Sequence, residues 1–259
     1  MRKYPASLIM TQPVQSAPDS LKNRVILVTG AGSGLGREAA LTYAKHGATL
    51  ALLGRNDKKL EAVYDEIVAA GGAEPAMFPF DLAAADDDGF ERLAGTISYH
   101  LKRLDGILHS AAAYFSLTPL HLQTLEQWNT LLKVNLAAPF ALTKACLPLL
   151  KASPDASVIF TGETHGKQPA AYWGGYAVSK SGLHALTTIF SEELEQTPNI
   201  RVNTLVPGPV ASPLRRKTHP GEDPDTLPQM AELMPWYLWL MGPDSREVRG
   251  QIIECRKNN

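Results

Sequence analysis

The chain has 259 residues, of which 44% are hydrophobic and 20% are charged. These fractions are typical of a folded, soluble protein and exclude a disordered one. Lys and Arg total 25 and Asp and Glu total 26, so the formal net charge is −1. A dedicated nucleic-acid-binding protein needs a basic excess to neutralise phosphates, and we therefore expect no nucleic-acid partner.

The composition also bears on location and on metal binding. Two cysteines, Cys146 and Cys255, are too few for a disulfide framework or a cysteine-rich zinc site, and they favour a reducing cytoplasm. The seven histidines show no metal-ligand spacing, so we expect no metal. The longest stretch without a charged residue, 106–125, contains two histidines and a proline and does not predict a membrane span.

Residues 1–20 are rich in Pro, Ser and Gln and predict a flexible extension, followed by one domain over 21–259. In that domain, short apolar runs alternate with longer segments of helical spacing. The predicted strands are Arg24–Thr29, Thr49–Leu53, Ala76–Phe80, Gly106–His109, Ser157–Phe160, Arg201–Val206 and a short one at Ile252–Ile253. The predicted helices are Leu35–His46, Asp57–Ala70, Phe90–Leu101, Leu125–Leu150 and Tyr176–Leu194.

Alternating strands and helices of these lengths predict an α/β domain with about seven parallel strands and helices on both faces of a doubly wound sheet. One segment departs from the pattern. Residues 211–235 contain five prolines and the basic run Arg215–Lys217. They predict an irregular segment on the substrate side, before a short apolar helix over Trp236–Met241.

A glycine-rich turn follows the strand that ends at Thr29 and opens the next helix. Glycine lets the backbone turn sharply and approach a pyrophosphate, while the helix N-terminus offers unpaired N–H groups to the anion. The alternative is a strand-to-helix turn without a ligand, but the strand before and the helix after it favour nucleotide binding. The candidate residues are Gly30, Ser33, Gly34, Leu35 and Gly36.

The residue after the second strand bears on which dinucleotide is bound. An acidic side chain there binds the ribose 2′-hydroxyl, whereas an arginine accommodates a 2′-phosphate. This chain has Arg55, with no carboxylate before Asp57. Because arginine pairs bidentately with phosphate, Arg55 predicts NADP(H) in preference to NAD(H), unless it is only a solvated surface residue. Asp81, which is followed by Leu82, ends the third strand and could accept a hydrogen bond from the adenine amino group or simply end the strand.

Tyr176 and Lys180 are four residues apart at the start of a predicted helix, so their side chains share one face. A tyrosine with its ordinary pKa near 10 is a poor base at neutral pH. A nearby cation stabilises the phenolate, so we expect Lys180 to lower the pKa of Tyr176. The pair could be a surface pair, but its position at the same sheet edge as the glycine-rich turn favours catalysis.

With these motifs the sequence resembles the short-chain dehydrogenase/reductase family from Leu21 to Gln251. The resemblance rests on TGAGSGLG at 29–36, LDGILHSAA at 104–112, VN at 134–135, YAVSK at 176–180 and VPGPVASP at 206–213. The run PWYLWLMGPDSR at 235–246 is similar to a bacterial subgroup of oxidoreductases without an established substrate. The resemblance implies a Rossmann-type sheet, a nicotinamide cofactor, and hydride transfer between an alcohol and a carbonyl.

The resemblance also implies roles for single residues. Tyr176 exchanges a proton with the substrate oxygen, and Lys180 holds the nicotinamide ribose and lowers the pKa of Tyr176. Asn135 anchors a water in the proton relay. The further cofactor contacts that it implies are Ala111, Ala112, Pro207, Gly208 and Val210.

The sequence departs from the family pattern at three positions, which are Ser110, Ala112 and Glu163. The usual Asn-Ala-Gly after the fourth strand reads Ser110-Ala111-Ala112, and Glu163 stands where the family has its substrate-orienting serine. Three outcomes remain open for Glu163. An ionised Glu163 would repel the developing negative charge, and a protonated one would donate a hydrogen bond to a carbonyl. Alternatively, Glu163 turns to a cation and Thr164 supplies the hydroxyl.

We expect an NADP(H)-dependent carbonyl reductase with a small carbonyl or alcohol substrate. The alternatives are a nucleotide-binding protein with little or no turnover, in a sensor or assembly role, and a 3-oxoacyl reductase whose substrate the run 215–217 would hold. The long fourth and fifth helices also predict a homodimer or homotetramer, because one helical layer has no obvious cover. The candidate interface residues are Ala137, Ala138, Ala141, Ala177, Ala185 and Leu186.

Overall fold

The structure is a computed structural model that describes residues 8–10 and 15–255. Their strands form one parallel sheet in the order β1-β8-β7-β6-β5-β2-β3-β4. The strands are β1 (Leu8–Met10), β2 (Val25–Thr29), β3 (Thr49–Gly54), β4 (Ala76–Pro79), β5 (Gly106–His109), β6 (Ala156–Thr161), β7 (Ile200–Val206) and β8 (Ile252–Cys255). All seven predicted strands are present, which confirms the predicted fold class.

Strand β1 lies inside the segment 1–20, for which the sequence predicts a flexible extension. Residues 8–10 instead pair in parallel with β8, from Leu8 opposite Ile253 to Met10 opposite Cys255. This pairing satisfies backbone groups of β8 that an edge strand would leave open. A run of three apolar residues carries no periodic signal, which is why the sequence did not predict it. The prediction for residues 1–7 and 11–14 lies outside the described residues.

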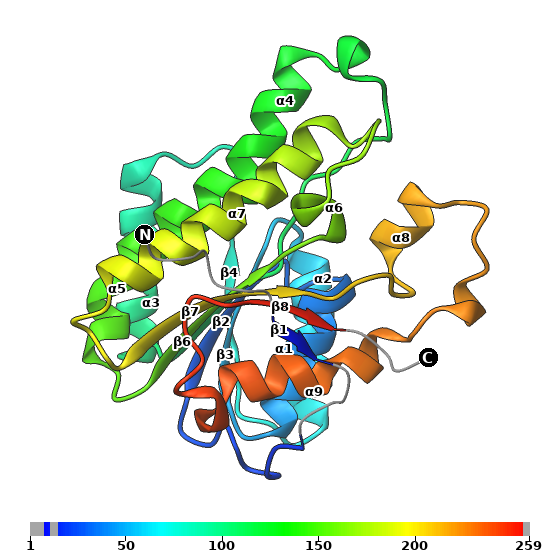
Figure 1. The fold of residues 1–259 in the computed structure, drawn as a ribbon. Helices are drawn as coiled ribbons and strands as arrows, with labels where there is room; N and C mark the ends of the chain where they lie inside the picture. The colour runs from blue at the N-terminus through cyan, green and yellow to red at the C-terminus, as the bar shows by residue number, and fades with distance from the viewer. Residues whose placement is uncertain (1–7, 11–14, 256–259) are drawn as a thin grey trace.

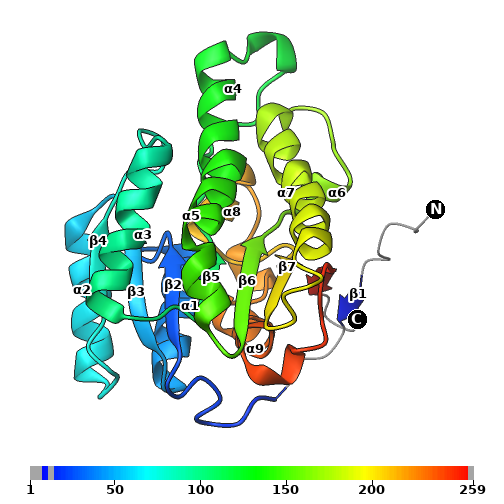
Figure 2. The ribbon, with the colours of Figure 1, turned by 90° about the vertical axis from the view of Figure 1, so that its left-hand side faces the viewer.

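Helices cover both faces of the sheet (Figures 1 and 2). One layer contains α1 (Gly34–Lys45), α2 (Asp57–Ala69) and α9 (Met230–Met241), and the other contains α3 (Asp87–Leu101), α5 (Ala138–Ala152) and α7 (Gly174–Glu193). In β2, Ile26 and Val28 pack in the core of the first layer, and Val25 and Leu27 in that of the second. Burial on both faces explains why these strands appear in the sequence as continuous apolar runs.

The predicted helix over 125–150 is interrupted. It consists of α4 (Leu125–Leu132), a π-helical turn over Lys133–Ala137, and α5. Thr124 and Gln127 form a capping box at the start of α4. A π-helical turn inserts an extra residue into the helical repeat and is frequent at functional sites. Here it contains Asn135, a predicted site residue.

The segment 211–235 contains more helix than its prolines predict. Helix α8 spans Pro213–Thr218, and Ser212 caps it by accepting a hydrogen bond from the N–H of Arg215. Proline is well tolerated at the first position of a helix, where its missing N–H would have no partner. Helix α9 begins at Met230, six residues before its predicted start, and has Pro235 in its interior. An interior proline normally ends a helix, so the sequence suggested a boundary there.

A buried ion-pair cluster lies at the amino-terminal end of the strands. The Asp155 carboxylate, just before β6, accepts a hydrogen bond of 2.6 Å from Arg24 Nη1 and pairs with Arg201 at the start of β7. All three residues are buried. Burial opposes ionisation of Asp155, but Arg201 and Arg24 more than offset it, and the pKa of Asp155 lies below its ordinary value. This cluster joins the starts of β2, β6 and β7.

Candidate active site

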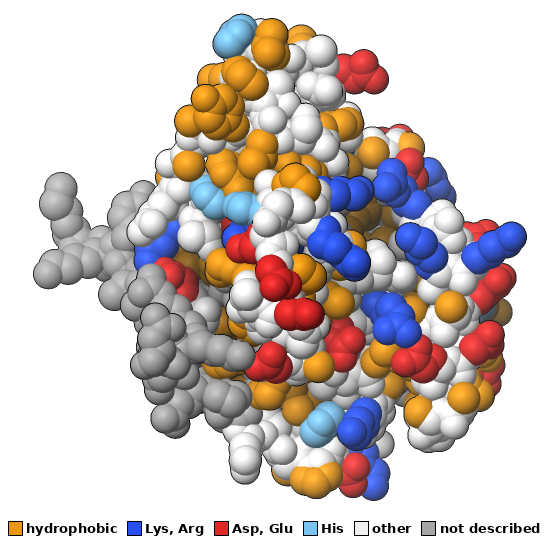
Figure 3. Space-filling model, turned by 90° about the vertical axis from the view of Figure 1, so that its right-hand side faces the viewer, with side chains coloured by type: hydrophobic (Ala, Val, Ile, Leu, Met, Phe, Trp, Pro, Cys, Tyr) orange, Lys and Arg blue, Asp and Glu red, His pale blue; other side chains and the backbone are white. Residues whose placement is uncertain are grey.

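A cavity of about 870 Å³ runs along the carboxyl ends of the strands. Its lining residues follow β2, β3, β4, β5, β6 and β7, and α8 borders it. The chain builds β3 and β4 on one side of β2 and then crosses to β5 on the other. Ligands of doubly wound sheets bind at such a switch point. Figure 3 shows this face, where Lys and Arg side chains gather around the hollow.

The glycine-rich turn after β2 forms one wall of the cavity. Gly30 has φ +69°, and a Cβ there would lie 2.9 Å from the Ala111 backbone. A Cβ on Gly36 would lie 2.5 Å from the Gly30 carbonyl oxygen, so only glycine allows α1 to approach the turn this closely. Gly36 itself does not line the cavity, and its role is to let these backbones pack. The predicted residues of this turn that line the cavity are Gly30, Ser33, Gly34 and Leu35.

Two cations stand where β3 meets α2. Arg55 lines the cavity as predicted, and so does Lys59, which the sequence analysis missed. Asn56 caps α2 by accepting a hydrogen bond from the Lys59 N–H, which fixes this first helical turn beside the cavity. The spacing of four residues from Arg55 to Lys59 is the sequence feature that could have predicted this second cation. Further along the same wall, Asp81 and Leu82 also line the cavity.

Tyr176 and Lys180 meet in the cavity wall from α7, and both are 3% exposed. Lys180 Nζ donates a hydrogen bond of 2.8 Å to the Thr161 carbonyl and lies 5.8 Å from the centroid of the Tyr176 ring. Burial lowers the pKa of Lys180 to about 8. Burial, and secondarily Glu163, raises the pKa of Tyr176 well above its ordinary value. The expected lowering of that pKa by Lys180 is therefore wrong: the pKa is raised, because the phenol is removed from water and the Glu163 carboxylate disfavours the phenolate.

The residues after β6 show where Glu163 points. Glu163 precedes the one-turn helix α6 (Thr164–Lys167), and its Oε1 lies 3.3 Å from Nδ1 of His165. Glu163, Thr164 and His165 all line the cavity. His165 is thus the hydrogen-bonding neighbour of Glu163, and the three outcomes considered for Glu163 stay predictions. Glu163 still raises the pKa of Tyr176, as in the first outcome.

Asn135 does not line the cavity and is buried. Its Oδ1 accepts a hydrogen bond of 2.7 Å from the Ala113 N–H, and its Nδ2 donates to the Ala113 carbonyl and to Ser179 Oγ. The side chain therefore joins the π-helical turn to the loop after β5 and to α7. The Thr29 hydroxyl accepts hydrogen bonds from the N–H groups of Ser110 and Ala111, which holds the start of the same loop.

The remaining predicted cofactor residues lie along the loops after β5 and β7. Those that line the cavity are Ala111, Ala112, Pro207, Gly208 and Val210.

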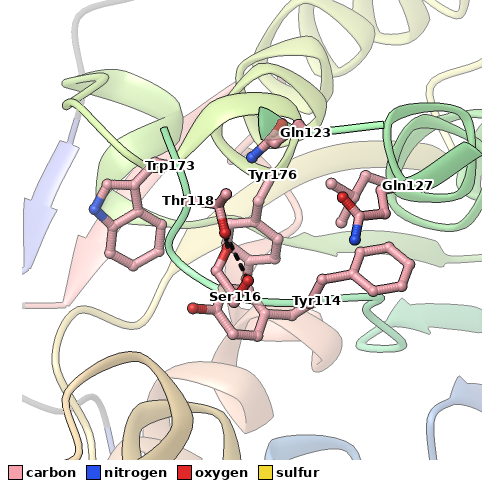
Figure 4. A pocket seen from close by; sticks show the side chains of 9 residues that line it. Tyr114, Ser116, Thr118, Gln123, Gln127, Trp173 and Tyr176 are labelled. Atoms are coloured by element: carbon pink, nitrogen blue, oxygen red, sulfur yellow. Dashed lines mark hydrogen bonds between the residues drawn. The ribbon is translucent and has the colours of Figure 1, made fainter. Parts of the chain in front are cut away.

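Aromatic rings border Tyr176 around a small pocket of about 10 Å³ (Figure 4). Tyr114 meets the Tyr176 ring edge-on at a centroid distance of 5.6 Å, and Trp173 lies 5.9 Å from it. A hydrogen bond of 2.6 Å joins the hydroxyls of Ser116 and Thr118 on the same wall. Neither Tyr114 nor Trp173 belongs to a motif with a known spacing, so neither was predicted from the sequence.

Metal binding and membrane crossing find no support in the described part of the chain. Among residues 8–10 and 15–255, no cluster of His, Cys, Asp and Glu is arranged to hold a metal ion. None of the helices in those ranges has the length and apolar character needed to cross a bilayer. Cys146 and Cys255 are both buried thiols.

Comparison with known proteins identifies the family of this chain. Residues 24–223 match the family model of short chain dehydrogenases. The chain belongs to this family. It is similar to the oxidoreductase YciK of Escherichia coli (strain K12), with 41% identity over 93% of this chain and 95% of that protein.

Solved structures agree with this assignment. A short chain dehydrogenase from Pseudomonas syringae is 40% identical with a TM-score of 0.91, over 95% of this chain and 99% of that one. Another, from Shigella flexneri 2a and solved in complex with NADP, is 41% identical with a TM-score of 0.89, over 92% of this chain and 99% of that one. The chain is thus an oxidoreductase-family protein with a Rossmann-type fold.

Proposed function

We propose that this short-chain dehydrogenase is an NADP(H)-dependent carbonyl reductase that acts on a small molecule in the cytoplasm. The observation that carries the proposal is that one cavity collects three features. These are the glycine-rich turn, the cations Arg55 and Lys59, and the pair Tyr176 and Lys180. The relative from Shigella flexneri was solved with NADP, which supports the choice of cofactor.

The residues of the cavity fit such a cofactor. The backbone at Gly30 and Gly36 packs against its neighbours at distances that a Cβ would block, and this packing holds the glycine-rich turn in the wall that would face a pyrophosphate. Arg55 and Lys59 would hold the 2′-phosphate, because both cations line the cavity where β3 is followed by α2. When bound, the nicotinamide would supply a hydride. The other residues that we propose to contact the cofactor are Ser33, Gly34, Leu35, Asp81, Leu82, Ala111, Ala112, Tyr176, Lys180, Pro207, Gly208 and Val210.

The chain's own residues would handle the proton. Tyr176 would donate its proton to the carbonyl oxygen, since its raised pKa keeps the phenol protonated at neutral pH. Lys180, with a pKa of about 8, is mostly charged at pH 7 and would hold the ribose beside the Thr161 carbonyl. Asn135 would act as a positioning residue, because its amide fixes the loop after β5. Thr164 and Glu163 lie on the cavity wall, where they can meet the substrate.

Two alternatives make different demands on the site. A nucleotide-binding protein with little turnover is favoured by one observation: burial and Glu163 make Tyr176 a weak acid. A 3-oxoacyl reductase would use the run 215–217 to hold an anionic carrier. Arg215 of that run is already engaged by Glu222, with Nη2 at 2.8 Å from Oε1, which weakens this alternative.

The proposal is tested by NADPH binding, followed through nucleotide fluorescence, and by NADPH oxidation with a panel of ketones, aldehydes and quinones. We expect turnover with at least one carbonyl. Tyr176→Phe should lose at least about 100-fold in kcat, since general acid catalysis contributes about 10²–10⁴-fold, while its Kd for NADPH stays the same. Tight NADPH binding without turnover of any compound would favour the binding protein instead.

A further inference from the structure

Glu163 and His165 form a hydrogen-bonded pair on the cavity wall, directly after β6. We propose that His165, oriented by Glu163, hydrogen-bonds the carbonyl oxygen of the substrate and replaces the hydroxyl for which the family pattern has a serine at position 163. This inference rests on the proposed carbonyl reduction and names the group that holds the substrate oxygen beside Tyr176.

The hydrogen-bond geometry directs one ring nitrogen to Glu163 and leaves the other available. Oε1 of Glu163 lies 3.3 Å from Nδ1 of His165, and the two side chains are 22% and 23% exposed. Both line the cavity that also contains Tyr176 and Lys180. A carboxylate on one imidazole nitrogen orients the ring, so that the other nitrogen can meet a reacting group. Nε2 is therefore the atom of His165 that can contact the substrate.

Trp173 fixes the plane of the His165 ring. The two rings are stacked, with centroids 3.8 Å apart and an interplanar angle of 14°. Trp173 is itself buried, and its ring centroid lies 5.9 Å from that of Tyr176. A buried ring thus links His165 to the proton donor. A stacked indole also stabilises a protonated imidazole through its π face.

The charge of the pair suits carbonyl reduction better than Glu163 alone would. A lone carboxylate beside Tyr176 repels negative charge on the substrate oxygen and raises the pKa of the phenol, as Glu163 does. In the proposed arrangement His165 carries a proton on each nitrogen, which offsets that charge, and it donates to Glu163 through Nδ1 and to the substrate oxygen through Nε2. Such a donor stabilises the charge that develops on the oxygen. Tyr176 transfers its proton to that oxygen, and His165 keeps both of its own.

Two substitutions of His165 separate this role from a structural one. The amide of His165→Asn occupies about the position of Nδ1 and can keep the contact with Glu163, whereas that of His165→Gln reaches about the position of Nε2. With a carbonyl substrate from the panel, we expect kcat to fall about 100-fold in His165→Asn and only about tenfold in His165→Gln. The Kd for NADPH should change less than twofold in either variant.

Three further variants complete the test. Glu163→Ser/His165→Ala returns the hydroxyl of the family pattern and should recover kcat to within a few-fold of wild type. Thr164→Val removes the competing hydroxyl and should lower kcat much less than His165→Asn does. His184→Ala is the matched control, because His184 is a partly buried histidine of α7 that is not among the residues lining the cavity.

The outcomes distinguish the inference from the proposed function. A larger loss in His165→Gln than in His165→Asn, or a loss confined to Thr164→Val, would overturn the role of His165 and leave the reductase intact. Turnover by Glu163→Ser/His165→Ala, with none in wild type, would show that the pair inhibits and would overturn the inference too. Absence of turnover in both, with NADPH bound, would overturn the proposed function.

Discussion

The two cations after β3 provide a quantitative test of cofactor preference. Arg55 and Lys59 both line the cavity, and both are exposed. A hydrogen bond to a charged group contributes about 1.5–3 kcal/mol, and solvent screening at an exposed site favours the lower end. Because about 1.4 kcal/mol corresponds to tenfold in affinity, each cation should contribute about tenfold to NADP(H) binding.

We therefore expect Arg55→Ala and Lys59→Ala each to weaken NADPH binding about tenfold, and the double variant about 100-fold if the two contacts act independently. Binding of NADH, which lacks the 2′-phosphate, should change less than threefold in all three. The Kd values are measured by nucleotide fluorescence at fixed ionic strength, because screening weakens exposed charge contacts.

Lys58→Ala is the matched control for this experiment. Lys58 is an exposed lysine of the same helical turn, but it is absent from the residues that line the cavity. It should leave both Kd values unchanged. Equal losses for NADPH and NADH in the Arg55 and Lys59 variants, or the same loss in Lys58→Ala, would refute a 2′-phosphate contact. A stronger affinity of the wild type for NADH than for NADPH would refute the preference itself.

Three other properties follow from the structure. Asp155→Asn should lower the free energy of unfolding in urea by about 3–5 kcal/mol, because it leaves buried arginines uncompensated. Glu222→Gln, in a more exposed pair, should lower it much less. Burial, with a smaller effect of a nearby lysine, lowers the pKa of His109 to about 3. Its folded pKa lies below its unfolded one, so stability is lost as pH falls from about 6.5 towards 3, by up to about 1.4 kcal/mol per unit, and His109→Gln should flatten that part of the urea profile. Finally, we propose a homodimer or homotetramer formed through α5 and α7, where Phe140 and Ile189 are 44% and 50% exposed. Phe140→Glu/Ile189→Glu should lower the mass measured by sedimentation. A wild-type monomer at micromolar concentration would contradict the proposal.

The side chains predicted for the interface differ from those that α5 and α7 expose. Six small or apolar residues of the two long helices were predicted to lie in an interface. Three of them, Ala138, Ala141 and Ala177, are buried inside the chain's own fold and cannot contact a partner directly. The large apolar side chains that α5 and α7 expose are others, which include Phe140 and Ile189. Composition showed that the helices are apolar, but only packing decides which of their faces is already covered.

The sequence by itself determined the features that depend on neighbouring residues. The seven strands were visible because strands buried on both faces are continuously apolar. The glycine-rich turn and the pair Tyr176 and Lys180 were visible because their function depends on fixed short spacings along a turn or a helix. These features specify the fold and the position of the cavity at the switch point of the sheet.

Only the tertiary structure decided the contacts between distant segments. The stacking of His165 on Trp173 and the use of Asn135 to hold the loop after β5 depend on how the loops and helices pack. The pKa of Tyr176 is raised by burial and by Glu163, thirteen residues earlier in the chain, whereas the sequence predicted a lowering by Lys180. Electrostatic and hydrogen-bond energies vary with distance and burial in three dimensions, and a linear sequence specifies neither for residues in different elements.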